Sequence, residues 1–236
     1  ADVLKVIERH TREYLPFEVY AKSLQEYFRN YEQTAGDWER HHSRMYPILD
    51  QYQRDGYGAL LKIGGKFGGA FLCDGVGLGK TFVGLMLIER LVKFERKKVL
   101  LIVPKSGREP VWESALRTYL PELFGVFSNL VVINHTDLQR GGEWIERLQR
   151  IKDQADVVVM DEAHHFRNPS TKKDTSRYWQ MQDLAKDKQV FMLTATPINN
   201  RLIDLQHLIE HFTQRDAGHF KETLGIHSLS GYFRKL

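Results

Sequence analysis

The stretch AFLCDGVGLGKTFVGLMLIERLVK, residues 70–93, joins an apolar run to a glycine-rich loop and then to a second apolar run of helical length. Gly77 and Gly79 permit backbone conformations, and a close approach of the backbone to a ligand, that a side chain would obstruct. At the start of the following helix, unpaired N–H groups and the helix dipole both favour an anion. A strand, a loop ending in Gly-Lys-Thr and a helix, in this order, predict a phosphate-binding loop.

The residue types of this loop indicate which parts of a nucleotide it holds. We expect Lys80 to neutralise the β- and γ-phosphate oxygens of ATP, and the Thr81 hydroxyl to hold magnesium. The alternative is a glycine-rich turn without a ligand, but Gly-Lys-Thr directly after an apolar strand argues against it. The predicted ATP-binding residues of the loop are Asp74, Gly75, Val76, Gly77, Leu78, Gly79, Lys80 and Thr81.

The chain from residue 46 onward alternates short β-branched apolar runs with helical stretches, which is typical of an α/β fold. The runs lack polar alternation, so we expect strands covered on both faces, as in a mostly parallel sheet. The five runs are GAFLCD (69–74), VLLIVP (99–104), LVVINH (130–135), DVVVMDEA (156–163) and QVFMLTAT (189–196).

A pair of carboxylates, Asp161 and Glu162, ends the fourth apolar run. Ligands of an open parallel sheet bind at the carboxyl ends of its strands, so we expect this pair to meet the phosphate loop there. Asp161 is then positioned to hold magnesium through a water molecule, and Glu162 to orient and deprotonate the attacking water. With Lys80, these are the predicted catalytic residues. An acidic helix cap is the alternative role for Asp161.

The composition is that of an ordinary soluble globular protein, with 42% hydrophobic and 27% charged residues and a formal net charge of +4. No stretch approaches the roughly 20 apolar residues of a membrane-spanning helix, so no membrane association is expected. The single cysteine cannot form an internal disulfide, which favours a reducing compartment, either a prokaryotic cytoplasm or a nucleus. Periodicity predicts helices within residues 1–36.

Three ordered motifs, DGVGLGKT (74–81), DEAHH (161–165) and LTATPINN (193–200), carry a family resemblance. With them, the chain resembles helicase superfamily two and, within it, the Snf-type, SWI/SNF-like DNA translocases, over roughly Tyr46 to Phe212. The usual phosphate-loop pattern begins with Gly; Asp in that position is what the Snf group shows, although this chain has Asp-Gly where the group usually has Asp-Glu. The segments VPKSGREPVWESAL (103–116), VVINHTDLQ (131–139) and HFRNPSTKK (165–173) resemble further family motifs.

The resemblance implies a RecA-like P-loop NTPase lobe over residues 46–212, an N-terminal helical extension over 1–45, and a C-terminal segment, 213–236, that leads toward a second lobe. It assigns adenine recognition to Gln53, for which facing solvent is the alternative. It assigns phosphate-backbone contact or coupling of the nucleotide to the nucleic acid to Pro104, Lys105, Ser106, Arg167, Thr194 and Thr196. Trp112 and Trp144 could stack on bases, but apolar neighbours at helical spacing favour packing.

The resemblance further implies an ATP hydrolase that uses ATP and magnesium and moves on duplex DNA, rather than on RNA, without separating the strands. A second RecA-like lobe, outside this chain, would supply arginines that complete the site. Without it, we expect the chain to bind ATP–magnesium weakly and to hydrolyse it poorly. The alternatives are the motor lobe of a restriction or defence enzyme and a degenerate nucleotide-binding scaffold.

Overall fold

The computed structural model describes residues 36–125, 128–170, 176–198 and 201–235. The chain divides into two compact units, residues 1–34 and 35–236, and only the second lies in the described part. The helices expected within residues 1–36 therefore lie outside the described residues, apart from Gly36 at their end. The division of the chain at residues 45 and 212 stays a prediction.

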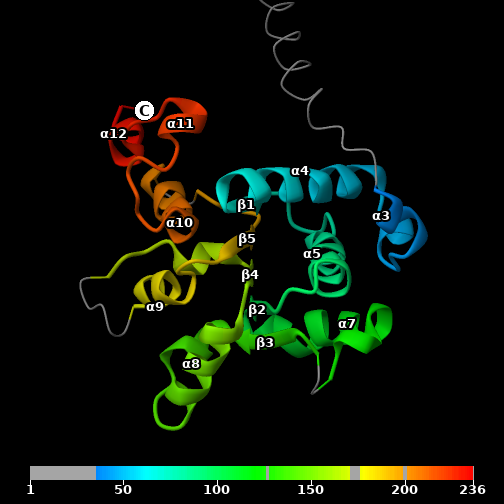
Figure 1. The fold of residues 1–236 in the computed structure, drawn as a ribbon. Helices are drawn as coiled ribbons and strands as arrows, with labels where there is room; N and C mark the ends of the chain where they lie inside the picture. Colours follow the sequence, from blue (N-terminus) through cyan, green and yellow to red (C-terminus); the bar gives the residue numbers. More distant parts are fainter. Residues whose placement is uncertain (1–35, 126–127, 171–175, 199–200, 236) are drawn as a thin grey trace, which may run out of the picture. The chain divides into compact units, whose positions relative to one another are not determined.

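Five strands form one sheet, and each lies within one of the five apolar runs. They are β1 (Gly69–Leu72), β2 (Val99–Val103), β3 (Leu130–Asn134), β4 (Val157–Asp161) and β5 (Gln189–Leu193). The order is β1-β5-β4-β2-β3 and every neighbouring pair is parallel (Figure 1). The α/β fold with a mostly parallel sheet is thus confirmed. Because β1 and β4 both run parallel to β5, which lies between them, the segments that follow β1 and β4 leave the sheet at the same edge.

Helices cover both faces of the sheet (Figure 1). Alternate side chains of each strand enter two cores: Leu101 and Val159 face one, Leu100 and Val158 the other. The first core is closed by α4 (Gln51–Phe67), α5 (Lys80–Glu89) and α7 (Ser114–Tyr119), and the second by α8 (Trp144–Gln154), α9 (Arg177–Leu184) and α10 (Ile203–Thr213). Burial on both faces explains why the strands lack polar alternation.

Shorter elements connect these layers. On the side of the first core they are α3 (Asp37–His41), η1 (Tyr46–Ile48), η2 (Arg90–Phe94), α6 (Lys105–Gly107), η3 (Arg108–Glu113) and η4 (Pro121–Leu123). Elsewhere they are η5 (His135–Gln139), η6 (Ala163–Phe166), α11 (Lys221–Leu224) and α12 (Leu229–Phe233). None of the helices in the described ranges is both long and apolar enough to span a membrane.

A buried carboxylate, Glu89, ties the segment before α4 to the end of α5. It accepts hydrogen bonds from Ser43 Oγ at 2.6 Å and from the backbone N–H groups of Arg44 at 2.9 Å and Met45 at 3.1 Å. Lys93 Nζ lies 3.0 Å from the same carboxylate. A buried charge is tolerated when it is paired and hydrogen-bonded, as here. Residues 43–45 therefore pack directly on the helix that follows the phosphate loop.

Candidate nucleotide-binding site

The loop between β1 and α5 turns through two glycines in the left-handed region. Gly77 has φ 83° and Gly79 has φ 75°, conformations that strain a residue with a Cβ atom. Val76 and Leu78, which alternate with these glycines, are 87% and 46% exposed. Because α5 begins at Lys80, its first N–H groups, which have no partner inside the helix, lie at the end of this loop. The loop thus combines flexible backbone, free amides and the positive end of a helix.

The side chain of Lys80 curls back over the loop. Its Nζ donates hydrogen bonds to the carbonyl oxygens of Asp74 and Gly75, both at 2.9 Å. A phosphate oxygen would be a stronger acceptor for this ammonium group than either carbonyl, since both partners would carry charge. Thr81 follows in the first turn of α5 and is half-buried.

Gln53 braces the phosphate loop from α4. Its Nε2 donates to the carbonyl oxygen of Leu78 at 3.2 Å, and its Oε1 accepts from the backbone N–H of Asp50 at 3.0 Å, which completes a capping box. A Cβ atom at Gly79 would overlap the Gln53 amide. The side chain is buried, so the alternative of a solvent-facing glutamine is wrong. Its role in adenine recognition stays a prediction.

Asp161, at the end of β4, is held by two donors. Trp112 Nε1 donates to Asp161 Oδ2 at 2.7 Å, and the backbone N–H of Glu162 donates to Oδ1 at 3.0 Å. Burial raises the pKa of the Asp161 carboxyl; the Trp112 hydrogen bond opposes this and so, more weakly, does the charge of Lys80. The charge of Lys80 therefore acts on the Asp161 carboxyl, although Lys80 follows β1 and Asp161 ends β4.

Glu162 stands in the left-handed region, with φ 50° and ψ 49°, which is uncommon for a residue other than glycine. His164 Nδ1 lies 3.0 Å from its Oε2 and 3.2 Å from Thr194 Oγ1 at the end of β5. Burial lowers the pKa of His164, and the nearby Arg167 lowers it further. The imidazole thus links the end of β4 to the end of β5. The exposed Thr196 donates its backbone N–H to Thr194 Oγ1 at 3.3 Å.

The residues expected to contact nucleic acid have two different environments. Pro104 caps the short helix α6, and Lys105 and Ser106 are exposed in it, directly after β2. Arg167, in contrast, is 14% exposed, and its Nε lies 3.7 Å from Asp204 Oδ2 of α10. Lys105 and Ser106 are accessible to a ligand, whereas Arg167 fastens the turn after β4 to α10. Nucleic-acid contact by any of them stays a prediction.

Two residues next to Asp161 were missed by the sequence analysis. Trp112 is fully buried, as its helical spacing indicated, but its hydrogen bond to Asp161 was not expected. His135 Nε2 lies 2.8 Å from the carbonyl oxygen of Asp161, and burial lowers the pKa of this histidine to about 4. Both residues are far from Asp161 in sequence, so no local spacing signals either contact.

The residue types at this edge of the sheet fit ATP and magnesium. Backbone amides and the Lys80 ammonium suit phosphate oxygens, while the Thr81 hydroxyl and the Asp161 carboxylate are the oxygen ligands that magnesium takes. Magnesium is held by one or two carboxylates together with substrate phosphates and water. It needs no cage of three or more His, Cys, Asp or Glu side chains, and no such cage exists within the described ranges.

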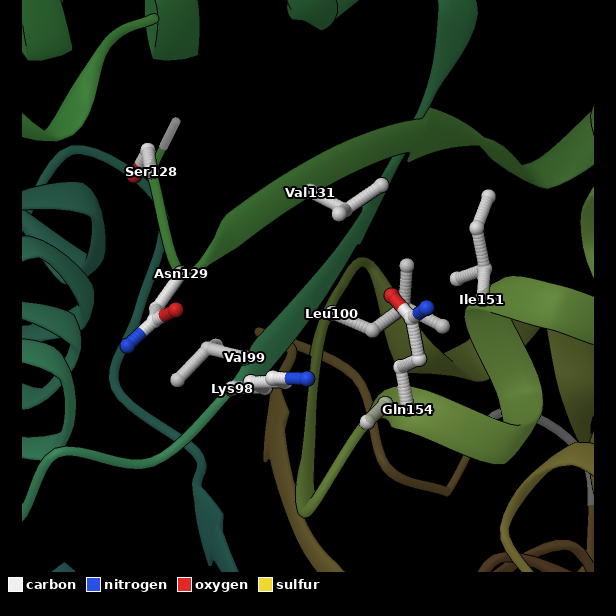
Figure 2. Close-up of a pocket in the computed structure, with 9 residues that line it drawn as sticks. Lys98, Val99, Leu100, Ser128, Asn129, Val131, Ile151 and Gln154 are labelled. Carbon is white, nitrogen blue, oxygen red and sulfur yellow. The ribbon is translucent and has the colours of Figure 1, made fainter. Parts of the chain in front are cut away.

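A pocket with a partly apolar lining lies elsewhere. Figure 2 shows a cavity of about 180 Å³ between the starts of β2 and β3 and the end of α8. Lys98, Val99, Asn129 and Ile151 are among the residues that line it. It therefore sits at the amino ends of the strands, at the opposite edge of the sheet from the phosphate loop. None of the predicted site residues lines it.

The family model of the SNF2-related domain matches residues 31–223. The "Uncharacterized ATP-dependent helicase YqhH" of Bacillus subtilis (strain 168) is 33% identical over 171 residues, which cover 68% of this chain and 29% of that protein. The DNA repair and recombination protein RAD54B of Gallus gallus is 27% identical over 191 residues, covering 69% of this chain and 20% of that one.

The fold is similar to that of the Sulfolobus solfataricus SWI2/SNF2 ATPase core in complex with dsDNA. The TM-score is 0.58 and the sequence identity 25%, over 74% of this chain and 38% of the archaeal chain. This chain thus spans less than a third of the length of each of the two relatives.

Proposed function

Because the chain belongs to the SNF2-related domain family, we propose that it is the ATP-binding and ATP-hydrolysing lobe of a DNA-dependent ATPase that translocates on duplex DNA. One observation carries the proposal. The phosphate loop after β1 and the Asp161–Glu162 pair after β4 leave the parallel sheet at the same edge, on either side of β5. In the proposal, the loop and the pair are the two halves of one phosphoryl-transfer site.

In this proposal the loop binds the phosphates and Gln53 the adenine. Lys80 exchanges the carbonyls of Asp74 and Gly75 for β- and γ-phosphate oxygens, and Thr81 and Asp161 hold the magnesium ion. Bound magnesium supplies neutralisation of the negative charge on the phosphate oxygens. The phosphate loop needs little rearrangement, since its glycines already have left-handed conformations.

Glu162 is the proposed general base. Its carboxylate orients the attacking water and takes its proton, while His164 holds the carboxylate at its Oε2 oxygen. The same imidazole contacts Thr194 at the end of β5. A displacement of the segment after β5 would therefore move the ring that holds the base. This supports a coupling role for Thr194 and Thr196.

Duplex DNA, rather than RNA, is the proposed partner. The Sulfolobus solfataricus SWI2/SNF2 ATPase core, which has a similar fold, was solved in complex with dsDNA. In this chain the exposed Lys105 and Ser106 after β2 suit phosphate contacts, which grip a backbone without reading its sequence. A second RecA-like lobe, supplying arginines from across a cleft, is a further part of the proposal, as is a cytoplasmic or nuclear location.

The choice of nucleic acid is tested by the ATPase rate of the full-length protein that carries this chain. The rate is measured alone, with duplex DNA, with single-stranded DNA and with duplex RNA, at fixed salt concentration. We expect the largest stimulation with duplex DNA, and a Lys105→Ala, Ser106→Ala variant that needs more DNA for half-maximal stimulation. Equal stimulation by duplex RNA, or none by any nucleic acid, would contradict the proposal.

A further inference from the structure

The indole of Trp112 is enclosed on the side of the sheet where α5 packs. Trp112 belongs to η3, after β2, and is fully buried. A Cβ atom at Gly84 of α5 would lie 2.6 Å from its Cη2 atom and 2.9 Å from Leu193 Cδ1 of β5. The ring is therefore wedged between the helix that follows the phosphate loop and the strand that separates β1 from β4. Such packing restrains the orientation of the indole.

In that orientation, the only polar atom of the ring faces the end of β4. Trp112 Nε1 donates to Asp161 Oδ2 at 2.7 Å, a short bond to a carboxylate of a half-buried residue. An indole N–H is a donor only, so it can bond to the carboxylate but cannot compete with it for a cation. The bond fixes the rotation of the carboxylate group while leaving oxygen lone pairs available.

We infer that Trp112 is a positioning residue, which sets the orientation of the Asp161 carboxylate for a divalent cation bound with the nucleotide. The inference rests on the proposed function, because it needs a metal–nucleotide complex at this edge. Hydrogen-bonding partners of metal ligands typically change metal affinity 10- to 100-fold when they are removed. The competing account is that Trp112 only fills space in the core.

Two substitutions separate these accounts. Trp112→Phe keeps an aromatic ring in the core and removes the N–H donor. Trp144→Phe is the matched control, because within the described residues the Trp144 indole nitrogen is buried without a hydrogen-bond partner. Asp161→Asn serves as the test of the proposed function itself, since it removes the charge of the proposed ligand.

The measurement is equilibrium binding of ATP to each variant at a series of magnesium concentrations, with the unfolding midpoint recorded in parallel. We expect Trp112→Phe to raise the magnesium concentration for half-maximal enhancement of binding by about 10- to 100-fold. The ATP affinity of Trp112→Phe without magnesium should stay unchanged. Trp144→Phe should match the parent both in this affinity and in the magnesium midpoint. If Trp112 only fills space in the core, Trp112→Phe would lower the unfolding midpoint without changing the magnesium midpoint.

The outcomes distinguish a failure of the proposed function from a failure of the positioning inference. If Asp161→Asn keeps the parent's magnesium dependence, the proposed function has failed. If Asp161→Asn loses it while Trp112→Phe keeps the parent's midpoint, the positioning inference is overturned. Should Trp112→Phe not fold, nitrogen-15 NMR of the parent's tryptophan indoles decides instead. The Trp112 N–H signal must then shift more with ADP–magnesium than with ADP alone, and an unchanged signal overturns the inference.

Discussion

Glu162 shows how single residues define this site. Its left-handed backbone conformation costs of the order of 1–3 kcal/mol for a residue with a Cβ atom, so neighbouring contacts must maintain it. His164 supplies one such contact, and the backbone bond from Glu162 to Asp161 Oδ1 supplies another. The two adjacent carboxylates therefore have different partners, Trp112 for Asp161 and His164 for Glu162, and can take different roles.

Gln53 gives a prediction at this scale. Gln53→Glu keeps the shape and the acceptor for Asp50, but it replaces the donor to the Leu78 carbonyl with a negative oxygen. We expect the loop to loosen and ATP affinity to fall roughly 10-fold, since losing one buried hydrogen bond costs about 1–3 kcal/mol. Equilibrium ATP binding checks this. The exposed neighbour Gln51→Ala is the control, and equal affinities for all three proteins would refute the bracing role.

Two buried histidines predict how stability depends on pH. Burial lowers the pKa of both His135 and His211 to about 4, whereas an unfolded histidine has a pKa of about 6.5. As the pH falls, the unfolded chain binds protons first, so both contributions to stability are lost between about pH 6.5 and about pH 4. At about 1.4 kcal/mol per pKa unit, each amounts to about 3 kcal/mol.

Urea denaturation across this pH range measures the effect. His211→Gln keeps a donor for the Phe166 carbonyl but cannot titrate, so its free energy of unfolding should fall less steeply with decreasing pH than that of the parent. Parallel curves for parent and variant would mean that His211 is not held neutral by the fold.

At the scale of elements, the strands and the phosphate loop were the predictable parts. Each strand is a continuous apolar run because both of its faces are buried, and that pattern is visible in the sequence without any tertiary information. Gly77 and Gly79 were singled out because they permit backbone conformations that a side chain would obstruct, and both have a positive φ in the structure. The contacts of Trp112 and His135 with Asp161 at the end of β4, and of Gln53 with the phosphate loop, depend instead on how distant elements pack, and no local pattern encodes them.

The packing of α5 gives a prediction of its own. Gly84→Ala would place a methyl group 2.6 Å from Trp112, in a core with no room to spare, so we expect a loss of about 1–3 kcal/mol in the free energy of unfolding. Gly65→Ala in α4 is the matched control, because its methyl group meets nothing within 4 Å and should stabilise that helix by about 0.5–1 kcal/mol. Urea denaturation of both decides. An unchanged free energy of unfolding for Gly84→Ala would show that the core around Trp112 can rearrange to accommodate the methyl group.

At the scale of the whole molecule, the order β1-β5-β4 is what makes one site from two distant motifs. The parallel sheet brings the loop at residues 74–81 and the pair at 161–162 to one edge, with Thr194 and Thr196 after the strand between them. In the proposal, a second lobe would supply its arginines to this same edge of the sheet.

The central claim is that the two motifs act on one bound ATP. Its most direct test is single-turnover hydrolysis of ATP by the full-length protein with duplex DNA, compared with a Glu162→Gln variant whose ATP affinity is measured in the same preparation. The account predicts that the variant binds ATP within a few-fold of the parent and hydrolyses it about 10²- to 10⁴-fold more slowly, the usual contribution of a general base. Hydrolysis by the variant at the parent's rate would contradict the account.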